Sequence, residues 1–123
     1  MIVQKNVNRS RAESFRIASS GLIHAINTQK NFQIQILIGL FIIIIAWILD
    51  FNRIEWLILI ITIALVLVAE LLNTVVEVVI DLAVKEKLVP DAKIAKDISA
   101  SAVLLISIFA VVVGLILFIP HLW

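Results

Sequence analysis

The sequence predicts an all-α membrane protein with an N-terminal amphipathic surface helix and three transmembrane helices. Of its 123 residues, 63% are hydrophobic, whereas a soluble domain has roughly 45–50% apolar residues. Three long apolar blocks follow one another, and the charged residues gather before and between them. A chain of this length forms one domain, residues 1–123, with room for about three spans of roughly 20 residues each.

The segment before the first apolar block has the pattern of a surface helix over about residues 11–29. Apolar side chains recur at helical spacing at Phe15, Ala18, Leu22 and Ile26, with arginine and serine on other faces. Such a helix lies on the bilayer, where arginine adds attraction to anionic lipid of about 1 kcal/mol each. An ordinary packed helix is the alternative. The segment lacks the apolar region and cleavage site of a signal peptide.

The three spans are predicted at about 34–50, 56–84 and 92–119. Only Gln35 interrupts the first apolar block, and the third contains a 22-residue apolar run, Ile98–Ile119. That run is about 33 Å long, enough to cross a bilayer core of ~30 Å.

Two polar segments join these spans, and aromatic residues mark their ends. Residues 50–55 form a short turn, while residues 85–91 contain Pro90 and read as a loop. Tryptophan gathers at membrane interfaces, and the three tryptophans near the span ends are Trp47, Trp56 and Trp123.

The distribution of lysine and arginine predicts the orientation. The first 33 residues and the second loop are basic, the first loop carries only Arg53, and the C-terminal tail carries none. The basic residues of the two rich segments are Lys5, Arg9, Arg11, Arg16, Lys30, Lys85, Lys87, Lys93 and Lys96. By the positive-inside rule, the N-terminus and the second loop lie in the cytoplasm.

A polar stripe crosses the second span, at Glu70, Asn73, Glu77 and Asp81. At 100° per residue these side chains fall within one ~80° stripe of a helix. Carboxylates in a membrane segment are costly, so they face a protein interior or wet cavity and mark a functional site. Counted from Trp56, Glu77 and Asp81 lie at the cytoplasmic boundary and Glu70 about 10 Å deeper.

Charged residues also precede the third span on the same side, at Lys93, Lys96 and Asp97. Lysine at this height is well suited to phosphate oxygens. The alternative is that Asp97 pairs within its own helix while the lysines only enforce topology, which is the favoured interpretation for Lys93.

Other sequence features exclude several function classes. The net charge of +1 gives no argument for nucleic acid, and the absence of cysteine excludes disulfides and thiol chemistry. No glycine-rich phosphate loop and no H-E-x-x-H pair occurs. His24 and His121 are solitary and are interpreted as interfacial side chains. A nucleotide would therefore have to be held by Mg²⁺, carboxylates and a few cations.

Two segments carry a family resemblance. Residues 70–81 read E-L-L-N-T-V-V-E-V-V-I-D, and residues 92–105 read A-K-I-A-K-D-I-S-A-S-A-V-L-L. They resemble the E-x-x-N-[ST]-x-x-E-x-x-x-D and A-K-x-A-K-D-x-x-A-x-A-V-L signatures of the prokaryotic diacylglycerol kinase and undecaprenol kinase family. Glu55-Trp56 resembles the start of its second span, and Ser14-Phe15-Arg16 resembles its surface helix.

This resemblance implies a homotrimer in the bacterial plasma membrane, with composite sites between subunits, that transfers the γ-phosphoryl group of MgATP to a lipid hydroxyl. It implies Glu70 as the general base on that hydroxyl and Asn73 as its hydrogen-bonding neighbour at the substrate. The acceptor is expected to be undecaprenol, with diacylglycerol close behind.

The resemblance implies a nucleotide side made of Glu77, Asp81, Lys96 and Asp97, with Glu77 as a metal ligand and Lys96 as a phosphate contact. Relatives usually place a second metal-binding glutamate in a context like E-x-N-F. Here residues 29–32 read Q-K-N-F, so Gln29 takes that position with a neutral amide. Weaker metal affinity or a shifted metal requirement is expected.

Two other interpretations stay open. Glu70 and Glu77 could serve a non-enzymatic oligomer that conducts ions or protons, although the full signature argues against this. The neutral Gln29 also allows a degenerate kinase that acts only as a scaffold.

Overall fold

The computed structural model describes residues 10–85 and 87–123, and this part of the chain is helical without any strand. Its elements are α1 (Arg11–Thr28), α2 (Lys30–Ile48), α3 (Arg53–Val84), α4 (Pro90–Phe118) and the short 3₁₀ helix η1 (Ile119–Leu122). The predicted all-α fold is confirmed. Lys5 and Arg9, which contribute to the predicted orientation, lie outside the described residues.

The helix ends follow from local capping. Ser10 accepts a hydrogen bond from the Glu13 amide at 3.2 Å and so starts α1. Asn52 and Glu55 form a reciprocal capping box that starts α3 at Arg53, three residues before the predicted position. Lys85 takes a left-handed conformation (φ 49°) and ends α3.

The loop between α3 and α4 is shorter than the sequence suggests. Pro90 was expected in this loop, but it is the first residue of α4. Proline is well tolerated there, because the first helical amide has no partner within the helix and the proline ring presets φ.

The first apolar span also begins earlier than expected. A single residue, Gln29, separates α1 from α2, which begins at Lys30 and ends at Ile48. The Gln33 side-chain amide donates to the carbonyl of Ile26 at 2.7 Å and thereby ties the two helices across their junction.

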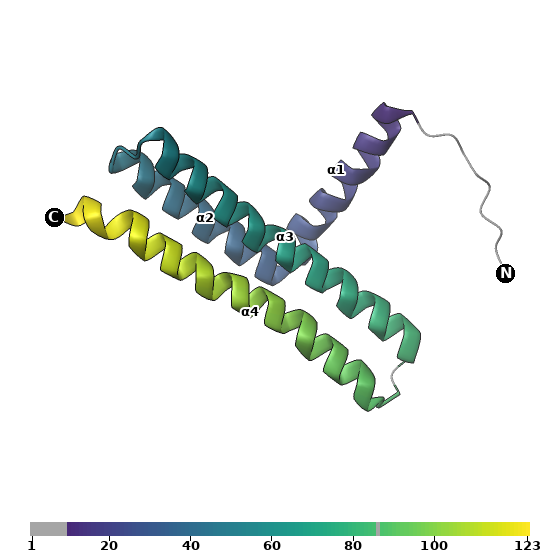
Figure 1. Cartoon of the computed structure of the whole chain (residues 1–123). Coiled ribbons are helices and arrows are strands. Elements are labelled where there is room, and N and C mark those ends of the chain that lie inside the picture. Colours follow the sequence, from purple (N-terminus) through teal and green to yellow (C-terminus); the bar gives the residue numbers. More distant parts are fainter. Residues whose placement is uncertain (1–9, 86) are drawn as a thin grey trace.

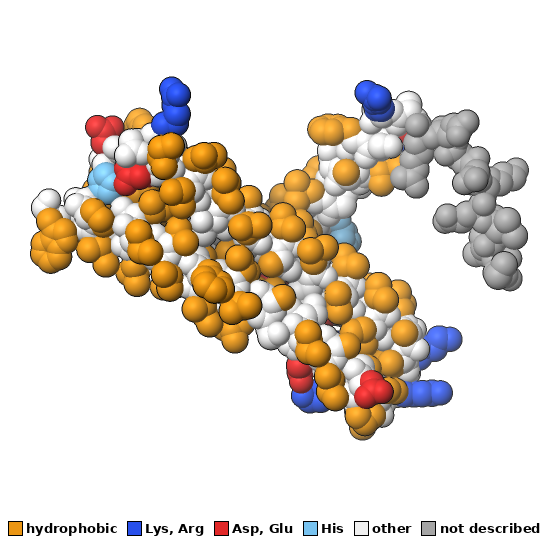
Figure 2. Space-filling model, viewed as in Figure 1, with side chains coloured by type: hydrophobic (Ala, Val, Ile, Leu, Met, Phe, Trp, Pro, Cys, Tyr) orange, Lys and Arg blue, Asp and Glu red, His pale blue; other side chains and the backbone are white. Residues whose placement is uncertain are grey.

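The long helix α3 packs against both α4 and α2, and α1 leaves this three-helix group at a steep angle (Figure 1). The junction of α1 and α2 lies beside the middle of α3, so the second half of α3 and the first half of α4 extend beyond α2 as a hairpin. Figure 2 shows hydrophobic side chains over most of the visible surface of α2, α3 and α4.

Three helices of the described chain are long and apolar enough to cross a bilayer: Lys30–Ile48, Arg53–Val84 and Pro90–Leu122. Because their apolar side chains face outward over most of their length, the chain is a membrane protein. The exposed aromatic residues Trp47 and Trp123 lie near the ends of these segments.

A small core closes the end of the bundle opposite the α3–α4 loop. It consists of Ala46, Phe51, Leu59 and Leu117. The Phe51 ring stacks on His121 with a centroid distance of 4.8 Å. His121 Nε2 in turn lies 2.5 Å from a carboxylate oxygen of Glu55, so this histidine ties the C-terminal segment to the start of α3.

Helix α1 keeps most of its apolar side chains uncovered. Phe15 is 74% exposed, and Leu22, Ile23 and Ile26 are also exposed, whereas Ala25 is buried near the junction with α2. An uncovered apolar side of this kind fits the expected position on a bilayer surface.

Candidate active site

The polar stripe lies on one uninterrupted helix, because α3 continues through all four of its residues. Burial changes along it: Glu70 and Asn73 are 5% and 8% exposed, whereas Glu77 and Asp81 are exposed. Asn73 Nδ2 donates to Glu77 Oε1 at 3.4 Å and links the buried and open halves. One side of α3 therefore joins a buried carboxylate to two accessible ones.

The buried carboxylate has a partner on α2. The Gln35 amide Nε2 donates to Glu70 Oε2 at 3.3 Å. From the sequence alone, Gln35 is only an interruption of an apolar block and has no predicted role. A lone polar residue in an apolar span was the available signal, because such a side chain normally needs a polar partner.

At the open end of the stripe, Lys96 on α4 reaches back to α3. Its Nζ lies 2.8 Å from Asp81 Oδ1, and 63% of the Asp81 side chain is exposed. Lys93 and Asp97 pair one turn apart on α4 at 2.6 Å, which agrees with the alternative interpretation that Asp97 pairs within its own helix. Exposed ion pairs contribute little to folding stability, so the charged groups of both pairs remain available to a charged ligand.

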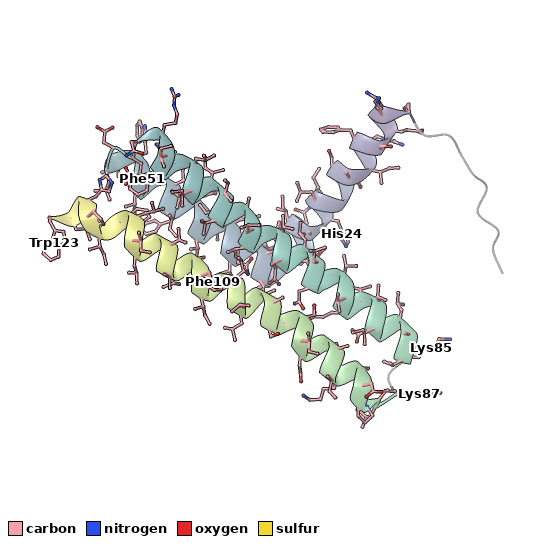
Figure 3. The ribbon with its side chains drawn as sticks, in the orientation of Figure 1. His24, Phe51, Lys85, Lys87, Phe109 and Trp123 are labelled. Carbon is pink, nitrogen blue, oxygen red and sulfur yellow. The ribbon has the colours of Figure 1, made fainter. Side chains whose placement is uncertain are left out.

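These charged residues border an open hollow of about 1060 Å³ between the ends of α3 and α4. Asp81, Lys96 and Asp97, all predicted at the nucleotide side, belong to its lining together with Lys85 and Lys87. Figure 3 labels Lys85 and Lys87 at the turn between the two helices. Glu77 lies one helical turn before Asp81 on α3 but is not part of this lining.

On the other side of Glu70, an apolar groove of about 450 Å³ runs between α2, α3 and α4 toward Phe118. Its walls are almost entirely aliphatic, with residues such as Ile42, Leu59 and Ile63. Gln35 lies at the edge shared by this groove and the Glu70 carboxylate. The arrangement thus places a carboxylate between an apolar groove and a charged hollow.

The chain that carries this arrangement matches a known protein family. The family model described as "Prokaryotic diacylglycerol kinase" matches residues 16–118, which include every part of the stripe, the groove and the hollow described above. The chain belongs to this family.

Two curated relatives of this diacylglycerol kinase family member agree. A "Diacylglycerol kinase" of Synechocystis sp. is 45% identical over 109 residues, which cover 89% of this chain and 62% of the relative. An "Undecaprenol kinase" of Bacillus subtilis is 34% identical over 110 residues, covering 89% of each chain. The chain thus spans about three fifths of the length of the Synechocystis relative.

Within this family member, Gln29 lies apart from the stripe in its contacts. Its Nε2 reaches only the Thr28 hydroxyl, at 3.5 Å, and no hydrogen bond links it to Glu77 in the described part of the chain. No group of three or more Asp, Glu, His or Cys side chains within residues 10–85 and 87–123 is arranged to hold a metal ion.

Proposed function

We propose that this protein is a lipid kinase that transfers the γ-phosphoryl group of ATP to the hydroxyl group of a membrane lipid. The observation that supports this most strongly is the change of burial along α3. Glu70 is 5% exposed beside an apolar groove, and the same side of the helix ends at the exposed Asp81–Lys96 pair. A reaction between a water-soluble phosphate donor and a lipid alcohol requires both environments within one site.

The buried end of the stripe is proposed to activate the acceptor. Glu70 takes the proton of the lipid hydroxyl while that oxygen forms a bond to the γ-phosphorus. The bond between the γ-phosphorus and the bridging oxygen breaks, and its electron pair leaves with ADP. Asn73, bound to Glu77 through its nitrogen, keeps its carbonyl oxygen free to accept a hydrogen bond from the substrate.

The open end is proposed to receive the nucleotide. Lys96 supplies a cation for phosphate oxygens, and Asp81 and Asp97 line the same hollow. Phosphoryl transfer needs positioning and charge neutralisation more than covalent chemistry. A short set of charged side chains is therefore sufficient in place of a glycine-rich loop.

The nucleotide is proposed to arrive with Mg²⁺, with Glu77 as one protein ligand. Gln29 is proposed as the second ligand only from its position in the family resemblance, because its side chain contacts Thr28 and not Glu77. Mg²⁺ is usually bound through one or two carboxylates together with substrate phosphates and water. The exposed carboxylate of Glu77, one helical turn from Asp81 on α3, fits this kind of site. The ion would offset the charge of the phosphate oxygens.

The apolar groove is proposed to hold the hydrocarbon chain of the acceptor. Its aliphatic walls lead away from Glu70 along the membrane-spanning helices. Undecaprenol and diacylglycerol both combine one hydroxyl group with long hydrocarbon chains, and the two relatives are named for one kinase of each kind. Undecaprenol is the expected acceptor, and diacylglycerol is the second candidate.

We further propose that the chain acts as a homotrimer in the bacterial plasma membrane, with its N-terminus and the α3–α4 loop in the cytoplasm. Four of its ten lysine and arginine residues lie in or next to that loop, which supports the orientation by the positive-inside rule. This side also carries the hollow proposed for ATP, so donor and site would lie in the same compartment.

The test is a phosphoryl-transfer assay with purified protein in lipid nanodiscs. Labelled ATP and Mg²⁺ are supplied with undecaprenol or diacylglycerol, and the labelled lipid phosphate is measured. The expected result is lipid phosphorylation that disappears in Glu70→Ala. Absence of transfer to either lipid would overturn the proposal, and ion flux through liposomes would then favour the ion-pathway alternative.

A further inference from the structure

The amide of Gln35 makes the only side-chain hydrogen bond between α2 and α3 in the described part of the chain. The rest of the groove between these two helices is almost entirely apolar, and Gln35 is the lone polar residue in the run from Ile34 to Leu49. An isolated amide in such a span costs free energy unless its polar atoms are satisfied. Helix packing alone would therefore favour an aliphatic side chain at this position.

Gln35 is only half satisfied. Its nitrogen donates to Glu70 Oε2, which turns its Oε1 away from the carboxylate. That oxygen is buried and has no hydrogen-bond partner. The Oδ1 of Asn73, one helical turn after Glu70 on α3, is likewise buried without a partner. Leucine would avoid the cost of the orphaned oxygen. A role in helix packing alone therefore does not explain why position 35 carries a glutamine that contacts Glu70.

The backbone holds Gln35 toward Glu70. Gly39 lies one helical turn further along α2, on the same side as Gln35. A Cβ atom built at Gly39 would lie 3.2 Å from Ile63 Cγ2 on α3, so the two helices approach closely there. Gly39 and Gln35 thus both lie on the side of α2 that faces α3.

We propose that Gln35 is a positioning residue for Glu70, an inference that rests on the proposed function. The hydrogen bond restrains the carboxylate through Oε2, while Oε1 receives no hydrogen bond from the described residues. Oε1 is then the oxygen that takes the proton of the lipid hydroxyl. Restraining a catalytic group in a productive orientation accelerates a reaction because less freedom is lost at the transition state.

The first test compares three variants in the nanodisc assay with each lipid. Gln35→Leu removes the donor and is expected to lower kcat by about 10- to 100-fold, the range expected for one hydrogen bond to a charged group. The KM for ATP is expected to stay unchanged. Gln35→His retains an N–H donor and should recover much of the rate. Gln33→Leu is the matched control: Gln33 donates to the Ile26 carbonyl rather than to Glu70, so near-normal kcat is expected.

The second test separates positioning from a general structural effect by a double-mutant cycle. If Gln35 acts through Glu70, Gln35→Leu will lower the residual rate of Glu70→Gln by much less than it lowers the wild-type rate. An equal loss in both backgrounds, or an unchanged kcat in Gln35→Leu, would overturn the inference alone. A wild-type protein that phosphorylates neither lipid would overturn the proposed function, and this inference with it.

Discussion

Lys96 and Asp81, which are 15 residues apart in the sequence, form an ion pair with a distance of 2.8 Å from Nζ to Oδ1. This pair connects the start of α4 to the last turns of α3 beside the charged hollow. Its two members are 37% and 63% exposed, so it adds little to folding stability. The importance of this ion pair therefore lies in its position at the proposed nucleotide site and not in its contribution to stability.

Lys96→Met is therefore expected to weaken ATP binding without destabilising the protein. The KM for ATP should rise about tenfold, as expected when one charged hydrogen bond is lost, while the melting temperature stays the same. Lys93→Met is the control, because Lys93 pairs with Asp97 on its own helix. A similar increase of KM in both variants would argue for a general effect of positive charge.

Glu70→Gln is expected to slow phosphoryl transfer strongly while the protein stays folded. A neutral amide of nearly the same shape cannot take the hydroxyl proton, and loss of a general base typically costs about 10²–10⁴-fold in rate. Initial rates and size-exclusion profiles of the two proteins provide the measurement. Near-normal turnover in the well-folded variant would contradict the role assigned to Glu70.

Gln29→Glu is expected to lower the Mg²⁺ concentration needed for half-maximal activity. The proposed metal site combines Glu77 with the neutral Gln29, and hard cations prefer anionic oxygen ligands. Glu77→Gln should shift the Mg²⁺ requirement in the opposite direction. Gln33→Glu adds the same charge one turn away and serves as the control; superimposable Mg²⁺ titrations for Gln29→Glu and the wild type would exclude Gln29 from the metal shell.

Cysteines at positions 53 and 87 are expected to react with an impermeant reagent from opposite sides of the membrane. The natural chain has no cysteine, and both residues are exposed: Arg53 begins α3, and Lys87 lies just beyond its other end. Position 53 should be labelled in intact cells and position 87 only after permeabilisation. Labelling of both in intact cells would refute the proposed orientation.

His121→Phe is expected to lower the melting temperature, because the Glu55 carboxylate loses its side-chain partner. Phenylalanine keeps an aromatic ring for the stack on Phe51, so the change tests the polar contact rather than the packing. Thermal unfolding in detergent measures the loss. The exposed His24 on α1 offers the control His24→Phe, whose melting temperature should equal that of the wild type.

Much of the fold was predictable from local sequence. Helix formation in an apolar segment depends on backbone hydrogen bonds inside that segment, and the period of 3.6 residues places Glu70, Asn73, Glu77 and Asp81 on one side without any tertiary information. Helix ends also follow local rules: Pro90, predicted in the loop, begins α4 because proline suits the first helical position as well as a loop.

The contacts that build the site depended on tertiary structure. Gln35 and Glu70 are 35 residues apart, Asp81 and Lys96 are 15 apart, and Glu55 and His121 are 66 apart. Whether such side chains meet depends on how the helices rotate and cross, which is set by packing such as that of Gly39 against Ile63. The sequence alone determined which polar residues the membrane segments carry and on which side of a helix they lie. The packing of the helices determined which of these residues contact each other. Each contact joins two helices, and the local sequence of one helix does not determine its distance from the other.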